Sequence, residues 1–215
     1  MKVLDLFCGG GGSAMGLHHA WPDAEITGVD IRPMPRYPFH FIQADAMTFP
    51  LEGYDFIWAS PPCQRYTLAQ NAAKNANAHP DLIAPVRERL AATGRPYVIE
   101  NVVGAPLINP IRLCGLSFGL LVRRHRLFEM SHFILVPTCQ CKDADYYVIF
   151  GHEVRSRRKG SQAVRKNNIA EGRRAMGIDW MTRGELSEAI PPAFSEFIVC
   201  QLMQAIPSLM AGVIQ

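Results

Sequence analysis

The stretch that decides the fold is Val3-Leu4-Asp5-Leu6-Phe7-Cys8-Gly9-Gly10-Gly11-Gly12. Its apolar first half predicts a short buried strand, and the glycine run predicts a tight turn that brings the backbone close to a ligand. Ser13 is a suitable N-cap for a helix over residues 14–20. An ordinary strand–helix turn would have the same pattern. A dinucleotide site is a further alternative, although Gly10-x-Gly12-x-x-x-Gly16 is spaced wrongly for the dehydrogenase fingerprint.

Short apolar runs continue along the chain and alternate with helical patterns. Strands are predicted at residues 25–30, 39–42, 54–59 and 96–100, and helices at 80–92 and 192–203. This alternation predicts an α/β fold with a doubly wound, mostly parallel sheet. Ligands of such sheets bind at the carboxyl ends of the strands. The residues at or just past those ends are Phe7, Asp30, Asp45, Cys63 and Glu100.

Length and composition indicate one globular domain, or one domain with a small appendage. The chain has 215 residues, of which 48% are hydrophobic and 19% charged, so it can bury a core. No apolar run approaches the roughly 20 residues of a membrane span. The first residues lack the apolar segment of a signal peptide, and six scattered cysteines do not resemble a disulfide framework. We therefore expect a reduced, cytoplasmic protein.

Basic residues are concentrated in one segment. Residues 155–174 contain eight Lys and Arg and one acid, so this segment carries +7 while the rest of the chain carries −4, for a net charge of +3. We call it the basic strip. A cationic strip on a mildly acidic body indicates a polyanionic partner, although a solvated surface would have the same composition. We expect residues 137–174, which contain the whole strip, to be irregular and turn-rich.

Three motifs beyond the first stretch suggest chemistry. Cys63 follows two prolines, which stiffen the backbone of a candidate nucleophile, although most free cysteines are small buried apolar residues. We interpret Cys8, Cys114 and Cys200 in this second way. Glu100 ends a predicted strand, where burial would raise its pKa and make it a proton donor, or where it could simply cap a turn. Arg124 and Arg126 would share one face of a strand and could contact a base edge and a phosphate.

Taken together, these motifs resemble those of the cytosine-C5 methyltransferases, in the order typical of that family. The matching segments are Asp5-Leu6-Phe7-Cys8-Gly9-Gly10, Pro61-Pro62-Cys63-Gln64, Glu100-Asn101-Val102, Arg124-x-Arg126 and Ala189-Ile190-Pro191-Pro192. Two positions depart from the family pattern. Val122 stands where a glutamine is usual, and Ser187-Glu188 stands where Gly-Asn is usual.

The resemblance implies a Rossmann-like class I fold and S-adenosylmethionine as cofactor, with S-adenosylhomocysteine as product. Phe7 would contact the adenine, Asp30 the ribose and Asp45 the adenine amine. The implied cofactor-binding residues are Phe7, Cys8, Gly9, Gly11, Asp30, Ile31, Asp45, Ala46 and Pro62. The implied catalytic residues are Cys63, which would attack C6 of a flipped cytosine, Glu100, which would engage N3 and the exocyclic amine, Arg126, which would contact O2, and Arg124.

The resemblance also implies double-stranded DNA as the partner of a monomeric enzyme. Residues 1–128 would form the catalytic core, 129–185 a small target-recognition region, and 186–215 a segment that returns to the core. A mobile loop over residues 64–79 would close over the flipped base. The implied nucleic-acid contacts are Gln64, Thr67, Arg155, Arg157, Arg158, Lys159, Arg165 and Lys166.

Other interpretations stay open at the level of sequence. A tRNA cytosine-C5 methyltransferase and a DNA-binding relative without catalysis would share most of these motifs, whereas the glycine spacing disfavours a nicotinamide dehydrogenase. A bacterial restriction–modification enzyme, a solitary regulatory enzyme and a phage self-protection enzyme would all carry this pattern. The compact chain favours a phage or mobile-element origin by analogy. Cys139-x-Cys141, with His132 and His152 nearby, suggests zinc, but the spacing fits no common zinc module and we assign no metal ligands.

Overall fold

We describe a computed structural model of the chain. It describes residues 1–66, 79–139, 141, 144–151, 153–159 and 164–209. The predicted loop at residues 64–79 lies largely outside this set. No helix among the described residues has both the length and the apolar character that crossing a membrane requires.

The main sheet has seven strands within the described residues, in the order β3-β2-β1-β4-β5-β7-β6. The strands are β1 (Lys2–Leu6), β2 (Glu25–Asp30), β3 (His40–Gln43), β4 (Phe56–Ala59), β5 (Tyr97–Asn101), β6 (Ile111–Cys114) and β7 (His125–Met130). The first five are parallel, whereas β7 is antiparallel to both β5 and β6. The predicted mostly parallel, Rossmann-like sheet is thus confirmed.

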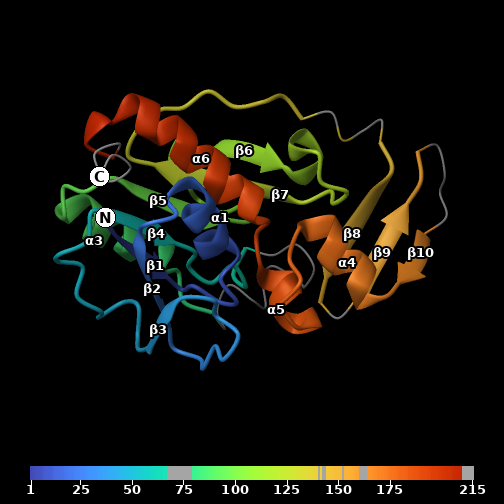
Figure 1. Ribbon diagram of the computed structural model, residues 1–215, viewed down its shortest axis with the longest axis horizontal. Helices are drawn as coiled ribbons and strands as arrows, with labels where there is room; N and C mark the ends of the chain where they lie inside the picture. Colours follow the sequence, from blue (N-terminus) through green and yellow to red (C-terminus); the bar gives the residue numbers. More distant parts are fainter. Residues whose placement is uncertain (67–78, 140, 142–143, 152, 160–163, 210–215) are drawn as a thin grey trace.

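Helices cover both faces of the main sheet because successive strand residues point to opposite sides. In β4, Phe56 and Trp58 pack in the same cluster as Phe194, whereas Ile57 packs with Leu90. Helices α1 (Gly12–Ala20) and α6 (Pro192–Ala205) therefore lie together on one face, and α3 (Ile83–Ala92) covers the other (Figure 1). Two short 3-10 helices, η1 (Gly115–Phe118) and η3 (Pro207–Leu209), complete this part of the chain.

Two details at helix starts differ from the prediction. Helix α1 begins after Gly11, a left-handed residue with φ 82°, and its N-cap is not Ser13, because the Ser13 hydroxyl is buried and donates to the carboxylate of Asp5 instead. Helix α3 begins at Ile83 rather than Pro80. The Asp81 carboxylate accepts from the backbone N–H of Ile83 at 3.2 Å and so marks the start of that helix.

A second, smaller unit follows β7, and the expectation of an irregular segment at residues 137–174 is wrong. Among the described residues, strands β8 (Tyr146–Phe150), β9 (Glu153–Arg157) and β10 (Val164–Asn167) form an antiparallel sheet, which we call the small sheet. Helices α4 (Ile169–Met176) and α5 (Arg183–Glu188) pack against it. Strand β8 is a continuous apolar run without a basic residue, and its Ile149 is buried together with Val154 of β9. The predicted boundaries of the target-recognition region, at residues 129 and 185, stay a prediction.

The close packing of α1 against α6 gives a test of the fold. A Cβ atom at Gly16 would lie 2.0 Å from the carbonyl oxygen of Pro192 and 2.2 Å from Ser195 Oγ. Gly16→Ala should therefore lower the free energy of unfolding by about 1–3 kcal/mol, measured by urea denaturation. Gly184→Ala is the matched control, because Gly184 is also helical and a Cβ there meets nothing within 4 Å. That control should be neutral or slightly stabilising, and equal losses for both variants would contradict the packing.

Candidate active site

The carboxyl ends of the parallel strands gather most of the predicted site residues at one edge of the main sheet. Phe7 directly follows β1, Asp30 ends β2 and Glu100 is the penultimate residue of β5. Cys63 follows β4 after the two prolines. This edge is where open α/β sheets bind their ligands.

The glycine turn after β1 is shaped by its backbone conformation. Phe7 has φ 56°, a left-handed conformation that is unusual for a residue other than glycine, and Gly9 and Gly11 have φ 49° and 82°. The backbone N–H of Gly9 donates to Asp30 Oδ2 at 3.1 Å, so the turn is tied to the end of β2. Cys8 is buried beneath the turn, and its N–H donates to the carbonyl of Val29.

A buried carboxylate beside an exposed apolar side chain marks the end of β2. Asp30 is 6% exposed, and its Oδ1 accepts from the N–H of Arg32 at 2.9 Å. Its neighbour Ile31 is 67% exposed, although isoleucine is usually buried. A carboxylate suits the hydroxyl groups of a ribose, and an exposed isoleucine offers an apolar surface to an aromatic ring.

The remaining predicted cofactor residues differ in exposure. Asp45 is exposed, and its Oδ1 accepts from the N–H of Met47 at 2.8 Å, as a turn-forming aspartate does. Ala46 is buried in the core beneath it. Pro62 and Gln64 are exposed on either side of the half-buried Cys63. Thr67 lies outside the described residues.

Glu100 and Arg126 form an ion pair at the centre of the site. Arg126 Nε lies 3.0 Å from Glu100 Oε1, and the two side chains are 14% and 10% exposed. Burial raises the pKa of Glu100, while the positive charges of Arg126 and Arg124 oppose that rise. Despite the ion pair, Glu100 Oε1 receives no aligned hydrogen bond from the described residues. A buried acceptor of this kind is costly unless a ligand satisfies it.

Arg124 holds the second unit rather than a base edge or a phosphate. Its side chain is buried, and it donates to the carbonyl oxygens of Ile149 at 3.1 Å and of Ser187 at 2.6 Å. These bonds join the start of β7 to β8 and to the end of α5. We therefore assign Arg124 as a positioning residue, which differs from the catalytic role expected from sequence.

Asn101 fixes the backbone of the Cys63 motif, a role that sequence reasoning missed. Its buried amide donates to the carbonyl oxygen of Pro61 at 2.9 Å, and its Oδ1 accepts from the N–H of Val102 at 2.9 Å. Asn101 thus connects the end of β5 to the segment that carries Cys63. The sequence feature that could have revealed this role is the position of Asn101 directly after Glu100 in the same motif.

Residues 180–188, just before the Ala189–Pro192 motif, contact the ends of β1 and β2 through polar side chains. Glu188, which stands at the departure from the family pattern, accepts from Arg32 at 2.9 Å, and Arg32 also lies 3.7 Å from Asp30. Trp180 donates from its indole Nε1 to the carbonyl oxygen of Gly10 at 2.8 Å. These contacts, too, were not predicted, because they join residues far apart in the sequence.

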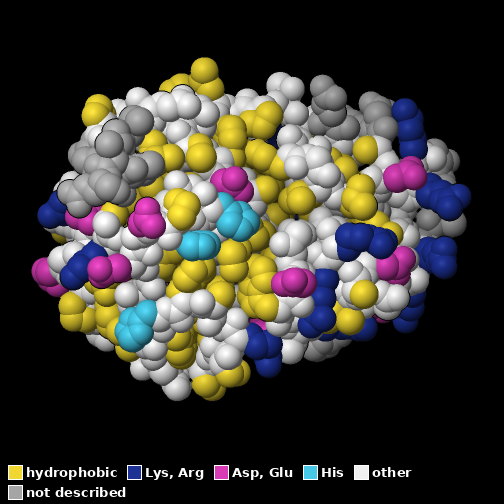
Figure 2. Space-filling model, viewed as in Figure 1, with side chains coloured by type: hydrophobic (Ala, Val, Ile, Leu, Met, Phe, Trp, Pro, Cys, Tyr) yellow, Lys and Arg dark blue, Asp and Glu magenta, His cyan; other side chains and the backbone are white. Residues whose placement is uncertain are grey.

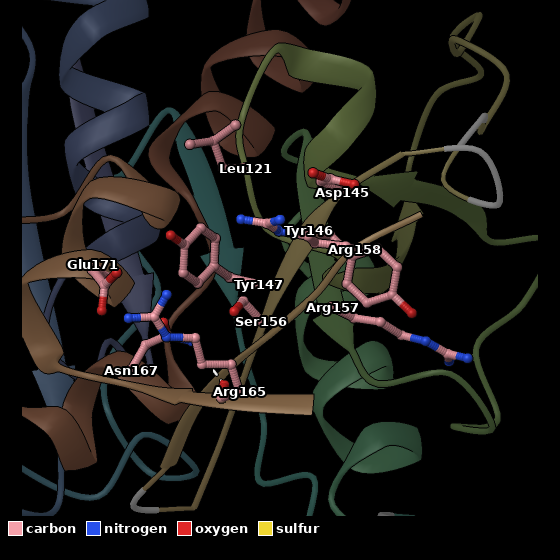
Figure 3. A pocket seen from close by; sticks show the side chains of 10 residues that line it. All are labelled: Leu121, Asp145, Tyr146, Tyr147, Ser156, Arg157, Arg158, Arg165, Asn167 and Glu171. Atoms are coloured by element: carbon pink, nitrogen blue, oxygen red, sulfur yellow. Dashed lines mark hydrogen bonds between the residues drawn. The ribbon is translucent and has the colours of Figure 1, made fainter. Parts of the chain in front are cut away.

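The basic side chains of the strip lie on β9, on the two residues that follow it, on β10 and on helix α4. Figure 2 shows Lys and Arg side chains gathered at that end of the molecule. Arg155 and Lys166 both pair with Glu153, which reduces their net charge. A cavity of about 530 Å³ opens here, and Figure 3 shows the side chains that line it. Its lining includes Arg157, Arg158, Arg165, Tyr146, Tyr147 and Asn167.

The predicted grouping of cysteines and histidines also differs in the structure. Cys139 and Cys141 lie beside Cys114 and His125, not beside His132, which is exposed. His152 lies outside the described residues. Cys114 is buried, as expected, but it belongs to this group and does not simply fill apolar space.

Comparison with known proteins relates the chain to methyltransferases by fold. No family model and no curated protein sequence matches it. Among solved structures, the methyltransferase EhMeth of Entamoeba histolytica aligns with a TM-score of 0.64 at 13% identity, over 96% of this chain and 98% of that one. A mutant of Spodoptera frugiperda DNMT2 aligns with a TM-score of 0.59 at 13% identity, over 94% and 99%. The chain shares their fold.

The network around Asp5 gives a pH-dependent prediction. Asp5 is fully buried beneath the glycine turn, where Ser13 and Tyr37 donate to it, and burial raises its pKa from 3.8 to about 8. The folded chain therefore keeps a proton that the unfolded chain releases, so the free energy of unfolding falls as pH rises between about 4 and 8. In the wild type this fall should reach up to about 1.4 kcal/mol per pH unit. Asp5→Asn should reduce the slope of the unfolding free energy against pH, measured by urea denaturation at each pH. The exposed Asp23→Asn is the control; if both variants keep the wild-type slope, Asp5 does not hold that proton.

Proposed function

We propose that the chain is a DNA cytosine-C5 methyltransferase that uses S-adenosylmethionine. The observation that carries this proposal is the buried Glu100 carboxylate, which pairs with Arg126 and lies at the same sheet edge as Cys63. Its Oε1 receives no aligned hydrogen bond from the described residues. A cytosine presents an exocyclic amine and N3 to such a carboxyl group, and its O2 to an arginine. The fold shared with known methyltransferases supports the same reaction class.

The residues present at the ends of β1 and β2 fit the proposed cofactor. Asp30 would accept from the ribose hydroxyls, and the exposed Ile31 would pack against the adenine. The turn from Phe7 to Gly11 would place backbone groups near the amino-acid part of the cofactor. When bound there, S-adenosylmethionine supplies an electrophilic methyl group.

The chain's own side chains would activate a weakly nucleophilic carbon. The Cys63 thiolate would add to C6 of cytosine, the C5=C6 electron pair would shift to form C4=C5, and the C4=N3 electron pair would move to N3, which takes a proton from Glu100. Burial, which raises the pKa of Glu100, favours the protonated form that this step needs. Arg126 would stabilise negative charge at O2. After C5 is alkylated, loss of its proton to water expels the Cys63 thiolate and Glu100 recovers its proton.

The partner proposed for the small sheet is double-stranded DNA. Arg158 and Arg165 line the cavity of Figure 3 with two tyrosines, so that phosphates would meet guanidinium groups and a base or sugar would meet aromatic rings. A target cytosine inside a duplex must leave the base stack to reach Cys63. A tRNA substrate would use the same cationic surface, and the transfer assay below separates the two.

Methyl transfer tests the reaction and its substrate. The wild-type protein with labelled S-adenosylmethionine should methylate C5 of cytosine in duplex DNA, and Cys63→Ala should reduce the rate by at least about a thousandfold because the covalent step is lost. Cys200→Ala is the control, since Cys200 lies on α6 away from the site, and it should retain the wild-type rate.

Either of two results would contradict the proposal. Transfer that survives Cys63→Ala would exclude the covalent mechanism. Transfer to tRNA with none to duplex DNA would exclude DNA as the substrate.

Salt dependence tests the surface that meets the polymer. If Arg158 and Arg165 contact phosphates, each substitution to alanine should weaken DNA binding across sequences and reduce the slope of log Kd against log salt by about 1. Arg95→Ala removes the same charge at an exposed position just before β5, outside the small sheet, and should leave the slope unchanged. Fluorescence anisotropy with a labelled duplex measures the slope. Equal effects from all three variants would show that only net charge matters.

A further inference from the structure

Four metal-binding side chains converge where β6 ends and β7 begins. They are Cys114, His125, Cys139 and Cys141, and one potential ligand atom from each lies within 4.8 Å of all the others. The group includes three sulfur atoms and one imidazole nitrogen. None of these residues has a role in the proposed methyl transfer.

Strand pairing and chain direction explain why the four residues meet. Strands β6 and β7 are antiparallel, and their register places Cys114 directly opposite His125. Facing residues of this kind have Cβ atoms about 5 Å apart. The chain then passes back over this strand end and contributes Cys139 and Cys141, two residues apart, so that the cluster joins two strands to the segment that leads to the small sheet.

The distances match a single tetrahedral metal ion. The sulfur atoms of Cys139 and Cys141 each lie 3.4 Å from His125 Nε2. Zinc bonds of about 2.3 Å to sulfur and about 2.0–2.1 Å to nitrogen, at tetrahedral angles, place such atoms about 3.6 Å apart. A set of three thiolates and one imidazole is among the combinations that zinc prefers in structural sites.

We propose that Cys114, His125, Cys139 and Cys141 form a structural zinc site that fixes the start of β7 to the segment entering the small sheet. Four protein ligands leave no open position for a substrate, which is the pattern of a structural site and not of a catalytic one. Cys114 and Cys141 are buried, and His125 and Cys139 are half-buried.

The surroundings suit the charge that such a site carries. Zinc with three thiolates and a neutral imidazole has a net charge of −1, and the positive side chains of Arg112 and Arg123 lie within electrostatic range of Cys139 and Cys141, respectively. These arginines belong to β6 and to the residues just before β7. They would offset part of the cost of holding a negative centre at the edge of the sheet.

The position of the site gives it a consequence for the catalytic centre. His125 stands between Arg124, which holds Ile149 and Ser187, and Arg126, which pairs with Glu100. A metal bond at His125 would restrict the backbone from which both arginines project. Loss of zinc should therefore loosen the contact between the main sheet and the small sheet.

Metal content tests the site directly. The full chain, prepared without a histidine tag and passed over a desalting column, should contain one zinc ion per chain by mass spectrometry of the elements. Cys139→Ser combined with Cys141→Ser should contain nearly none, and Cys200→Ser, which changes a cysteine outside the cluster, should keep one. Replacement of zinc by Co²⁺ in the wild type should give the intense absorption of tetrahedral cobalt with sulfur-to-cobalt charge transfer.

Three results would overturn the proposal. The first is wild-type protein that contains no zinc after refolding with zinc present. The second is a double variant that retains as much zinc as the wild type. The third is metal-free protein with a disulfide among these cysteines and full thermal stability. If the double variant does not fold, the zinc content and the cobalt spectrum of the wild type decide the question. A fall in melting temperature on treatment with a chelator, reversed by zinc, would support the structural role.

Discussion

The buried ion pair between Glu100 and Arg126 is the interaction on which the rest of the site depends. Burying two charges costs several kcal/mol per ion, and only close pairing offsets that cost, so the two strands that carry them must be held accurately. Strand β7 runs antiparallel to β5 at this point, inserted between β5 and β6 in the main sheet. The result is a carboxyl group that is desolvated and paired, yet its Oε1 receives no aligned hydrogen bond from the described residues.

Three consecutive residues at the start of β7 connect this pair to the rest of the molecule. Arg126 meets Glu100, His125 lies in the cysteine cluster, and Arg124 donates to carbonyls of β8 and the end of α5. Because neighbouring residues of an extended chain point in different directions, one short segment can hold the reaction centre, an edge of the main sheet and the small sheet at once. A structural change in the small sheet can therefore affect the pair of Glu100 and Arg126 through few intervening bonds.

The sequence predicted the parts of this arrangement that depend on local pattern. Residues 25–30 form a strand with the predicted bounds, and the residues at the ends of β1, β2 and β5 meet at one sheet edge, because periodicity and the geometry of parallel sheets determine both. It did not predict that Ser13 binds Asp5 instead of capping α1, that Arg124 holds carbonyls, or that Cys114 faces His125. These contacts depend on strand register and on distant segments, which local pattern does not specify. The small sheet was missed because residues 137–174 were judged by their basic, turn-rich composition, although β8 within them is a continuous apolar run.

Trapping of the covalent intermediate tests the central claim most directly. A duplex with 5-fluorocytosine at the target position cannot lose a proton from C5, so the bond between Cys63 and C6 should persist once C5 has been alkylated. Incubation with S-adenosylmethionine should yield a denaturation-resistant complex, and mass spectrometry of its peptides should place the modified base on Cys63. A duplex that binds and is methylated at unmodified cytosine, yet yields no adduct with 5-fluorocytosine or one on another residue, would contradict this account.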